Sequence, residues 1–311
     1  MKLIKDFVVG DHINSQFVVG SVSKNTSMNM GQTYYTVELK DASGSISCKK
    51  WEVNDGDNEL LVNGNVIEAE LEINLYKESL QGKIINIWKI LPEEIDVSRF
   101  VKKSPIPKEK LVEKFNKYLS KIEDKDYLNV VNRFIKDNED KFFDYPAASS
   151  VHHEFSSGLL MHVTSMLEIA DHLCDIYNDI NKSLVLAGVI LHDIGKIREL
   201  EGPISYHYTL EGKLIGHISI MSAEVVNICE ELNIDKEKTI LLQHMVLSHH
   251  GQLEFGSPVL PQTKEALLLS LVDKLDSAMT IADKALEDVT EGECSQKVYH
   301  LDNRTFYKPK K

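Results

Sequence analysis

The sequence has few of the features that mark secreted or fibrous proteins. Its four cysteines lie far apart and form no Cys-x-x-Cys pair, which argues against a disulfide framework or a thiolate zinc site. We therefore expect reduced and mostly buried thiols. Eight prolines and sixteen glycines, with no tract biased toward either, argue against a collagen-like or largely disordered chain.

Long hydrophobic runs are also missing. The longest apolar stretch, residues 183–191, ends at His192 and Asp193 and is far shorter than the roughly 20 residues that span a bilayer. Residues 1–6 lead into a polar pattern without an apolar core, so we expect no secretory signal. These absences predict a soluble, cytoplasmic protein.

The chain has fewer positively than negatively charged side chains. The chain has 35 lysines and arginines against 48 aspartates and glutamates, which gives a formal net charge of -13. Such a charge, if spread evenly, repels nucleic acid. Nucleic-acid binding therefore requires a local basic surface or a surface that carries metal ions.

The first part of the 311-residue chain is patterned for strands. Short alternating segments predict five of them, at residues 17–24, 33–40, 45–53, 67–75 and 83–90. The sequence Asp41-Ala42-Ser43-Gly44 predicts a hairpin between the second and the third. Five strands in so short a segment favour a small barrel that resembles an OB-fold of the nucleic-acid-binding kind.

The rest of the chain is patterned for helices. After a stretch punctuated by Pro92, Pro105 and Pro107, helical periodicity predicts helices at residues 108–122, 127–138, 159–177, 183–194, 218–232, 235–248 and 263–286. Two domains are the expectation for a chain of this length. A barrel is followed by an all-α domain.

Histidines and aspartates form the most informative pattern. Most of the twelve histidines lie between His152 and His250. The set that concerns us comprises His162, His192, Asp193, His217, His249, His250 and Asp273. Imidazole nitrogens with carboxylate oxygens suit divalent transition metals. Asp193 could bridge two ions through its two oxygens.

This order of residues, with Ile194-Gly195-Lys196 after Asp193, resembles the HD-domain metal-dependent phosphohydrolase superfamily. The resemblance implies two sets of metal ligands: His162, His192, Asp193 and Asp273 for one ion, and Asp193, His217 and His249 for the other. His250 is the alternative to His249, because adjacent helical positions point about 100° apart. Asp193 and Lys196 are the candidate catalytic residues. Lys196 lies one helical turn after Asp193, where it could neutralise a phosphate or activate water.

Other residues are open to two interpretations. His153, before the first ligand helix, either touches substrate or caps the helix. Asp276 either orients a ligand histidine or is simply solvated. The basic and aromatic residues 304–311 form a loosely ordered tail or a substrate-facing one.

The barrel carries candidate RNA contacts. Tyr35, Lys49 and Trp51 are the predicted substrate-binding residues, through base stacking and phosphate contacts, with Lys50 as a further cation. Tyr34 and Tyr35 point to opposite faces of a regular strand, so at most one of the two faces a ligand.

An OB-like barrel joined to an HD domain resembles the YhaM family of bacterial 3′→5′ exoribonucleases over nearly the whole chain. The resemblance implies a manganese-dependent phosphodiesterase that trims single-stranded RNA, and also single-stranded DNA, by two-metal hydrolysis. It also implies a homo-oligomer without a membrane partner. One departure, Ser157-Gly158 in place of two glycines, touches no ligand.

The predicted fold class is therefore multidomain α+β, an N-terminal five-stranded OB-like β-barrel followed by an all-α HD domain. The predicted boundaries are residues 1–92 for the barrel, 93–145 for a linker and helical connector, 146–290 for the HD domain and 291–311 for a C-terminal tail.

Two alternatives stay open. An HD-type nucleotide phosphohydrolase or cyclic-nucleotide phosphodiesterase would use the same metal centre on a small nucleotide, although the barrel favours a polymer. No Gly-Tyr-Pro sequence follows His250, which counts against a cyclic-diguanylate enzyme. A non-catalytic RNA-binding adaptor is disfavoured, because burying so many ligand side chains without metal is costly.

Overall fold

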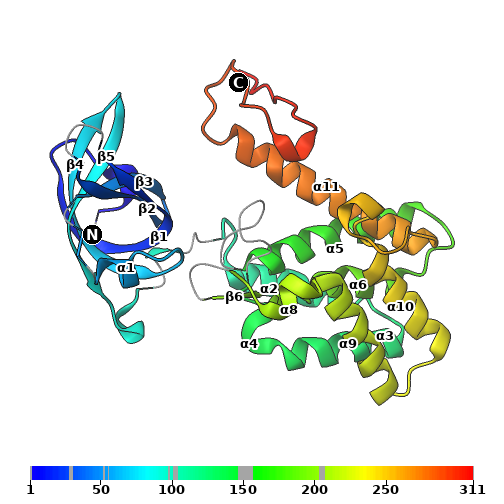
Figure 1. Ribbon diagram of the computed structural model, residues 1–311. Coiled ribbons are helices and arrows are strands. Elements are labelled where there is room, and N and C mark those ends of the chain that lie inside the picture. Colours follow the sequence, from blue (N-terminus) through cyan, green and yellow to red (C-terminus); the bar gives the residue numbers. More distant parts are fainter. Residues whose placement is uncertain are drawn as a thin grey trace. The chain divides into compact units, whose positions relative to one another are not determined.

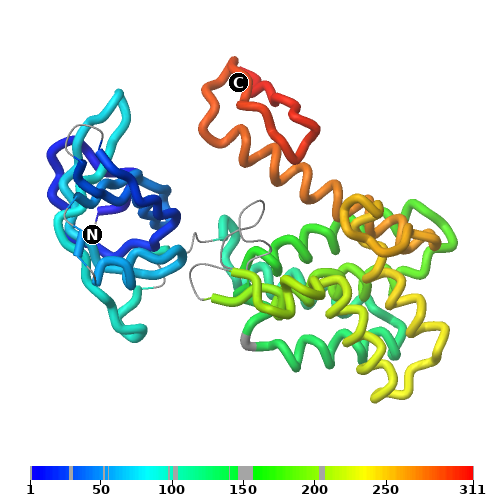
Figure 2. Tube along the Cα trace, in the orientation of Figure 1, coloured from blue at the N-terminus to red at the C-terminus, as the bar shows by residue number. Residues whose placement is uncertain are grey.

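The computed structural model describes residues 2–27, 31–51, 53–54, 56–96, 99–100, 104–145, 157–202 and 207–310. The chain divides into two compact units (Figures 1 and 2). The first contains Met1–Lys103 with Gly202–His207, and the second contains Ser104–Glu201 with Tyr208–Lys311. Within the described ranges, every helix is too short or too polar to cross a bilayer.

The first unit is a closed five-stranded barrel. Its strands are β1 (His12–Thr26), β2 (Thr33–Asp41), β3 (Gly44–Lys50), β4 (Val66–Tyr76) and β5 (Ser79–Lys89). They pair in the order β1-β2-β3-β5-β4, and β4 pairs back with β1. The five predicted strands are confirmed, as is the hairpin, in which Asp41 pairs with Gly44.

Alternation builds the barrel core. In β4, Ile67, Ala69, Leu71 and Ile73 are fully buried, while the glutamates between them are only partly buried. This period of two is the signature of a strand with one face on a core. The pattern in the sequence therefore decides which face of the strand points inward.

One glycine permits the closure of the barrel. The only parallel pairing among the five strands joins β3 to β5, with Cys48 opposite Gly82. A Cβ atom at Gly82 would lie 2.4 Å from the Cys48 sulfur, so a larger residue would push the two strands apart. Burial raises the pKa of the Cys48 thiol to about 12, which keeps it protonated.

The second unit is helical. Its helices are α2 (Lys108–Leu119), α3 (Lys125–Asp137), α4 (Glu139–Phe142), α5 (Gly158–Ile176), α6 (Lys182–Leu191), α7 (Lys196–Glu199), α8 (Leu210–Leu214), α9 (His217–Glu231), α10 (Lys236–Ser248) and α11 (Lys264–Leu286). All seven predicted helices are present. The short α4, α7 and α8 and the two-residue strands β6 (Leu200–Glu201) and β7 (His207–Tyr208) were not predicted, because they are too short for periodicity to register.

The buried helix α6 is central to this unit. Every residue from Leu184 to Leu191 is buried, and the Asn181 side chain caps the helix by accepting from the backbone of Leu184 at 3.1 Å. Helices α3, α5, α10 and α11 pack against it. The chain leaves this apolar helix directly into His192 and Asp193, which fixes both side chains inside the unit.

The cysteines are free thiols, as expected. Cys48 and Cys229 are buried, Cys174 is partly buried and Cys294 is exposed.

Candidate metal centre

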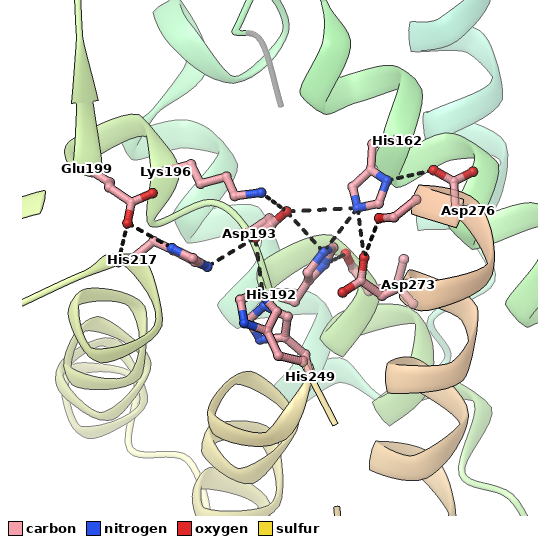
Figure 3. A network of polar contacts seen from close by, with 12 residues as sticks. His162, His192, Asp193, Lys196, Glu199, His217, His249, Asp273 and Asp276 are labelled. Atoms are coloured by element: carbon pink, nitrogen blue, oxygen red, sulfur yellow. Dashed lines mark hydrogen bonds and ion pairs between the residues drawn. The ribbon is translucent and has the colours of Figure 1, made fainter. Parts of the chain in front are cut away.

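Side chains from distant parts of the chain meet at the end of α6 (Figure 3). They come from α5, from the residues that follow α6, from the start of α9, from the residue after α10 and from α11. The structure brings all six predicted metal ligands into this group: His162, His192, Asp193, His217, His249 and Asp273. Helix packing thus converts a scattered pattern into one cluster.

Asp193 lies at the middle of the cluster, and its two oxygens face different partners. Oδ2 lies 3.8 Å from Nε2 of His162 and 3.3 Å from Nε2 of His192. Oδ1 lies 3.5 Å from Nε2 of His217 and 3.8 Å from Nε2 of His249. Asp273 joins the first side, with Oδ1 at 3.4 Å from Nε2 of His162. This is the arrangement expected of a carboxylate that bridges two cations.

Backbone carbonyls orient two of the histidines. His192 donates from Nδ1 to the carbonyl oxygen of Val189 at 2.8 Å, and His249 donates from Nδ1 to that of Val246 at 2.6 Å. A carbonyl oxygen only accepts, so the proton of each neutral ring is on Nδ1. Nε2 of each ring is then left as a lone-pair donor toward the centre.

Carboxylates orient the other two histidines. His162 donates from Nδ1 to Asp276 at 2.7 Å, and His217 donates from Nδ1 to Glu199 at 2.9 Å. Glu199 also accepts from the backbone N–H of His217 at 3.1 Å. The orienting interpretation of Asp276 is therefore the one the geometry favours. Glu199 was not predicted; its position one short helix after Asp193 was the available signal.

Burial and neighbouring charges set the protonation of the groups in the centre. Burial raises the pKa of Asp193, but the nearby cation of Lys196 and the ring of His192 outweigh burial and bring it well below its usual range. Burial lowers the pKa of His249, and the neighbouring ring of His192 lowers it further. Burial also lowers the pKa of His162, yet contacts with two aspartates raise it to about 10. The aspartates thus favour a proton on His162, and the same negative charge would favour a divalent ion at its Nε2 in place of that proton, whereas His249 stays neutral.

Three buried ligand atoms of this centre lack a hydrogen-bond partner among the described residues. They are Oδ1 of Asp193, Nε2 of His217 and Nε2 of His249. Leaving a buried polar atom unsatisfied costs about 1–3 kcal/mol. A divalent cation among them would satisfy all three at once, and their nitrogen and oxygen chemistry suits such an ion. The residues present therefore fit a metal.

His250 also lies at this side of the centre. One ligand atom each of His217, His249 and His250 lies within 4.8 Å of the others. His250 donates from Nδ1 to the carbonyl of Phe255 at 2.7 Å and is more exposed than His249. Both histidines thus stay candidates for the second ion.

Gly195 and Lys196 shape the approach to Asp193. A Cβ atom at Gly195 would lie 2.4 Å from the carbonyl oxygen of His217, so the glycine lets the start of α9 come close. Lys196 donates from Nζ to Oδ2 of Asp193 at 2.7 Å. Burial lowers the pKa of Lys196, but Asp193 outweighs burial and raises it. The lysine therefore stays cationic.

Of the predicted barrel contacts, Tyr35 is buried, whereas Trp51 and Lys49 lie together beside Tyr34. Tyr35 is 7% exposed, belongs to the barrel core and hydrogen-bonds to Asn58, which counts against a substrate contact. Its neighbour Tyr34 instead stacks on Trp51, with ring centroids 4.5 Å apart. Lys49 Nζ lies 5.3 Å from the Tyr34 ring.

Two further predicted contacts have other outcomes. Lys50 is buried and donates to the carbonyl of Ile85 at 3.2 Å, so it does not present its charge to a ligand. His153 lies outside the described residues.

Comparisons with known proteins agree with this geometry. Residues 159–278 match the HD domain family. The 3′-5′ exoribonuclease YhaM of Geobacillus sp. (strain WCH70) is 43% identical, over 99% of this chain and 95% of its own length. The protein of the same name from Bacillus subtilis (strain 168) is 39% identical, over 97% of this chain and 96% of its own length. Similarity of this extent confirms the resemblance predicted from the sequence: the chain belongs to the YhaM family of 3′-5′ exoribonucleases.

Proposed function

We propose that this protein trims single-stranded RNA from the 3′ end by metal-dependent hydrolysis of phosphodiester bonds. The observation that carries the proposal is the bridging position of Asp193, whose two oxygens face two separate histidine pairs. The two relatives are 3′-5′ exoribonucleases, and this supplies the substrate and the polarity of the proposal. The barrel supports a polymer rather than a free nucleotide, because it adds an aromatic surface.

Two divalent ions, which we propose to be Mn²⁺, are held by two ligand sets. His162, His192, Asp193 and Asp273 hold the first, and Asp193, His217 and His249 hold the second, with His250 as the alternative to His249. When bound, such ions neutralise phosphate charge and lower the pKa of water toward neutrality.

Side chains around the ligands orient the histidines and place a positive charge where the phosphate would bind. Asp276 and Glu199 hold the imidazoles of His162 and His217 by their Nδ1 protons, so that each Nε2 is directed to the centre, where a metal ion would bind it. Lys196 keeps a positive charge beside Asp193, where it can donate to a nonbridging phosphate oxygen. Lys196 and Asp193 are the catalytic pair that we propose.

In this proposal the barrel binds the RNA strand on the 5′ side of the scissile bond. Tyr34 and Trp51 form a stacked platform, with the ammonium of Lys49 5.0 Å from the centre of the Tyr76 ring. Stacking reads no base edge and no 2′-hydroxyl, so the platform would accept single-stranded DNA as well as RNA. Tyr34 takes the role first assigned to Tyr35.

We also propose self-association, supported by an apolar stripe on α11. Leu267, Leu271, Leu275 and Met279 are spaced four residues apart and are 51%, 58%, 48% and 56% exposed. Such spacing aligns side chains on one helix face, and exposed stripes of this kind mark interaction surfaces. Sedimentation of wild type and of a Leu271→Glu variant tests this, since the variant should move toward the monomer.

The decisive experiment compares 3′-labelled and 5′-labelled single-stranded RNA with added Mn²⁺, for wild type and Asp193→Asn. We expect shortening from the 3′ end, lost in the variant, with RNA affinity retained. Asp283→Asn on the exposed side of α11 is the matched control. Calorimetric titration with Mn²⁺ should give binding in wild type and little in Asp193→Asn. Intact RNA together with hydrolysis of free nucleotides would contradict the proposal.

A further inference from the structure

The C-terminal residues form a folded hairpin rather than a loose tail. Two isolated bridges hold it, Cys294 with Tyr307 and Val298 with Arg304. Lys308 ties the hairpin to the end of α11 by donating from Nζ to the carbonyl of Leu286 at 2.9 Å. We call residues 293–308 the C-terminal hairpin; it begins shortly after α11 ends (Figure 1).

A cavity of about 590 Å³ lies between the last turns of α11 and this hairpin. Ile281, Ala285 and Val289 supply apolar walls, and Lys284, Lys297 and His300 supply polar ones. Its volume is in the range of small-ligand sites, which are typically about 300–1,000 Å³. An apolar hollow with cationic walls suits a flat, partly apolar group that carries a negative charge.

The hairpin also exposes aromatic rings beside positive charge. Tyr299 is 78% exposed and Tyr307 is 55% exposed. Within the hairpin, the cations Lys297, Arg304 and Lys308 stand against the acids Glu293 and Asp302. The hairpin thus carries a small positive excess in a chain with a net charge of -13. Aromatic faces with lysines and arginines are the usual means of binding a single strand.

Acidic groups in the cavity wall fit the same ligand. Asp288 and Glu293 contribute to its wall. Carboxylates accept hydrogen bonds from the exocyclic amino groups of nucleobases. The cavity therefore offers apolar surface for a base, acceptors for its edge and cations for the phosphates beside it.

We propose that this cavity and the C-terminal hairpin bind a nucleotide of the single-stranded RNA, as a second contact apart from the metal centre. The inference rests on the proposed RNA substrate. Helix α11 carries both sites, since Asp273 and Asp276 are at the centre and Ile281 and Ala285 are at the cavity. At 1.5 Å per residue, the nine residues from Asp276 to Ala285 span roughly 14 Å of helix. The cavity thus holds an internal nucleotide rather than the one at the 3′ end.

Photocrosslinking of the wild-type chain tests the location directly. RNA carrying 4-thiouridine at single positions is bound with EDTA present, irradiated, and the crosslinked peptides are identified. We expect crosslinks in residues 281–307 from an internal position but not from the 3′-terminal nucleotide. If RNA binds and no position crosslinks to this segment, the proposal is overturned while the proposed function stands. If wild type neither binds nor trims RNA, the proposed function itself has failed.

Substitutions give an independent measurement. Tyr299→Ala and Lys297→Gln change exposed side chains, so folding should be unaffected. We expect each to weaken binding of a long single strand about fivefold or more, by loss of stacking or phosphate contact. Hydrolysis of bis(p-nitrophenyl) phosphate, which reaches only the metal centre, should be unchanged.

Matched controls are Tyr177→Ala, which removes a 57% exposed tyrosine at the end of α5, and Lys236→Gln at the start of α10. Both should bind RNA as wild type does. Equal RNA affinity of all four variants would overturn the proposal. So would a change in sedimentation instead of RNA affinity in the hairpin variants, because the surface would then be a protein interface.

Discussion

His162 is held at both ring nitrogens by aspartates of a single helix. Its Nδ1 donates to Asp276 at 2.7 Å, while its Nε2 lies 3.4 Å from Asp273, three residues earlier on α11. One turn of helix therefore supplies both a predicted ligand and the group that fixes the ligand histidine next to it. The register of α11 against α5 sets the geometry of the first ion site.

Asp276→Asn should weaken metal binding. The amide keeps the size of the side chain but loses the charge that makes His162 a strong donor, so we expect Mn²⁺ affinity to fall about 10–100-fold. Calorimetric titration of the purified protein measures this without any substrate. Asp283→Asn, on the same helix, should bind Mn²⁺ as wild type does. An unchanged affinity in Asp276→Asn would show that the hydrogen bond does not tune the ligand.

Gly195→Ala should disturb the second ion site. The added methyl group would lie 2.4 Å from the backbone oxygen of His217, so α9 must shift and carry His217 with it. We expect at least a tenfold loss of RNA trimming, in line with the cost of small displacements at catalytic centres. Gly188→Ala is an instructive comparison, because its methyl group would meet the flexible side chain of Met245 instead. Equal activity of Gly195→Ala and wild type would contradict the role of the close approach.

Trp51→Ala should weaken RNA binding without changing the chemistry. Loss of one stacking partner costs about 1–3 kcal/mol, or roughly fivefold to 150-fold in affinity. Fluorescence anisotropy with labelled single-stranded RNA in EDTA measures the affinity. Tyr35→Phe removes only a buried hydroxyl and should bind RNA as wild type does. A stronger effect of Tyr35→Phe than of Trp51→Ala would reverse our assignment of the barrel surface.

Asp171→Asn should destabilise the helical unit in a pH-dependent manner. Burial raises the pKa of Asp171, but Lys121 and Lys182 outweigh it and bring the pKa below 3.8. A carboxyl whose pKa is lower in the folded state adds stability above its unfolded pKa, and this stability is lost as the pH falls through the folded pKa. At neutral pH the variant should lose about 1–3 kcal/mol.

Urea unfolding at several pH values tests this expectation. The difference between Asp171→Asn and wild type should shrink as the pH falls from about 5 toward about 3. Asp175→Asn is the matched control, because Asp175 pairs with the same Lys182 at 2.8 Å but its side chain is 64% exposed. Its effect should stay within about 0.5 kcal/mol. A pH-independent loss in Asp171→Asn would assign its role to packing.

The sequence alone could predict the cluster of ligands because their chemistry is unusual on apolar helices. His192 and Asp193 follow a fully apolar segment, and polar side chains buried there need a hydrogen-bond partner or a metal ion. Glu199 could not be predicted in the same way, since a glutamate at the end of a short helix is common on surfaces. Carbonyl partners such as those of Val189 and Val246 carry no residue-specific signal at all.

The barrel shows a second limit of what the sequence alone can predict. Alternation predicted that Tyr34 and Tyr35 face opposite ways, but not which of the two lies inside. The whole strand decides which alternate residues point into the barrel, and here they are Tyr35, Val37 and Leu39, all buried. The C-terminal hairpin was equally hard to predict, because its two bridges are isolated pairs without a periodic pattern.

Closure of the barrel limits how it can recognise a nucleic acid. Each of the five described strands has a neighbour on both sides, so none is an edge strand along its whole length, and an extended ligand could add backbone hydrogen bonds only at the parts of strands that are paired on one side. A bound strand is then held mainly by side chains on the outer surface and by loops. Contacts of this kind do not distinguish one base from another, so we expect the proposed RNA trimming to depend little on base sequence.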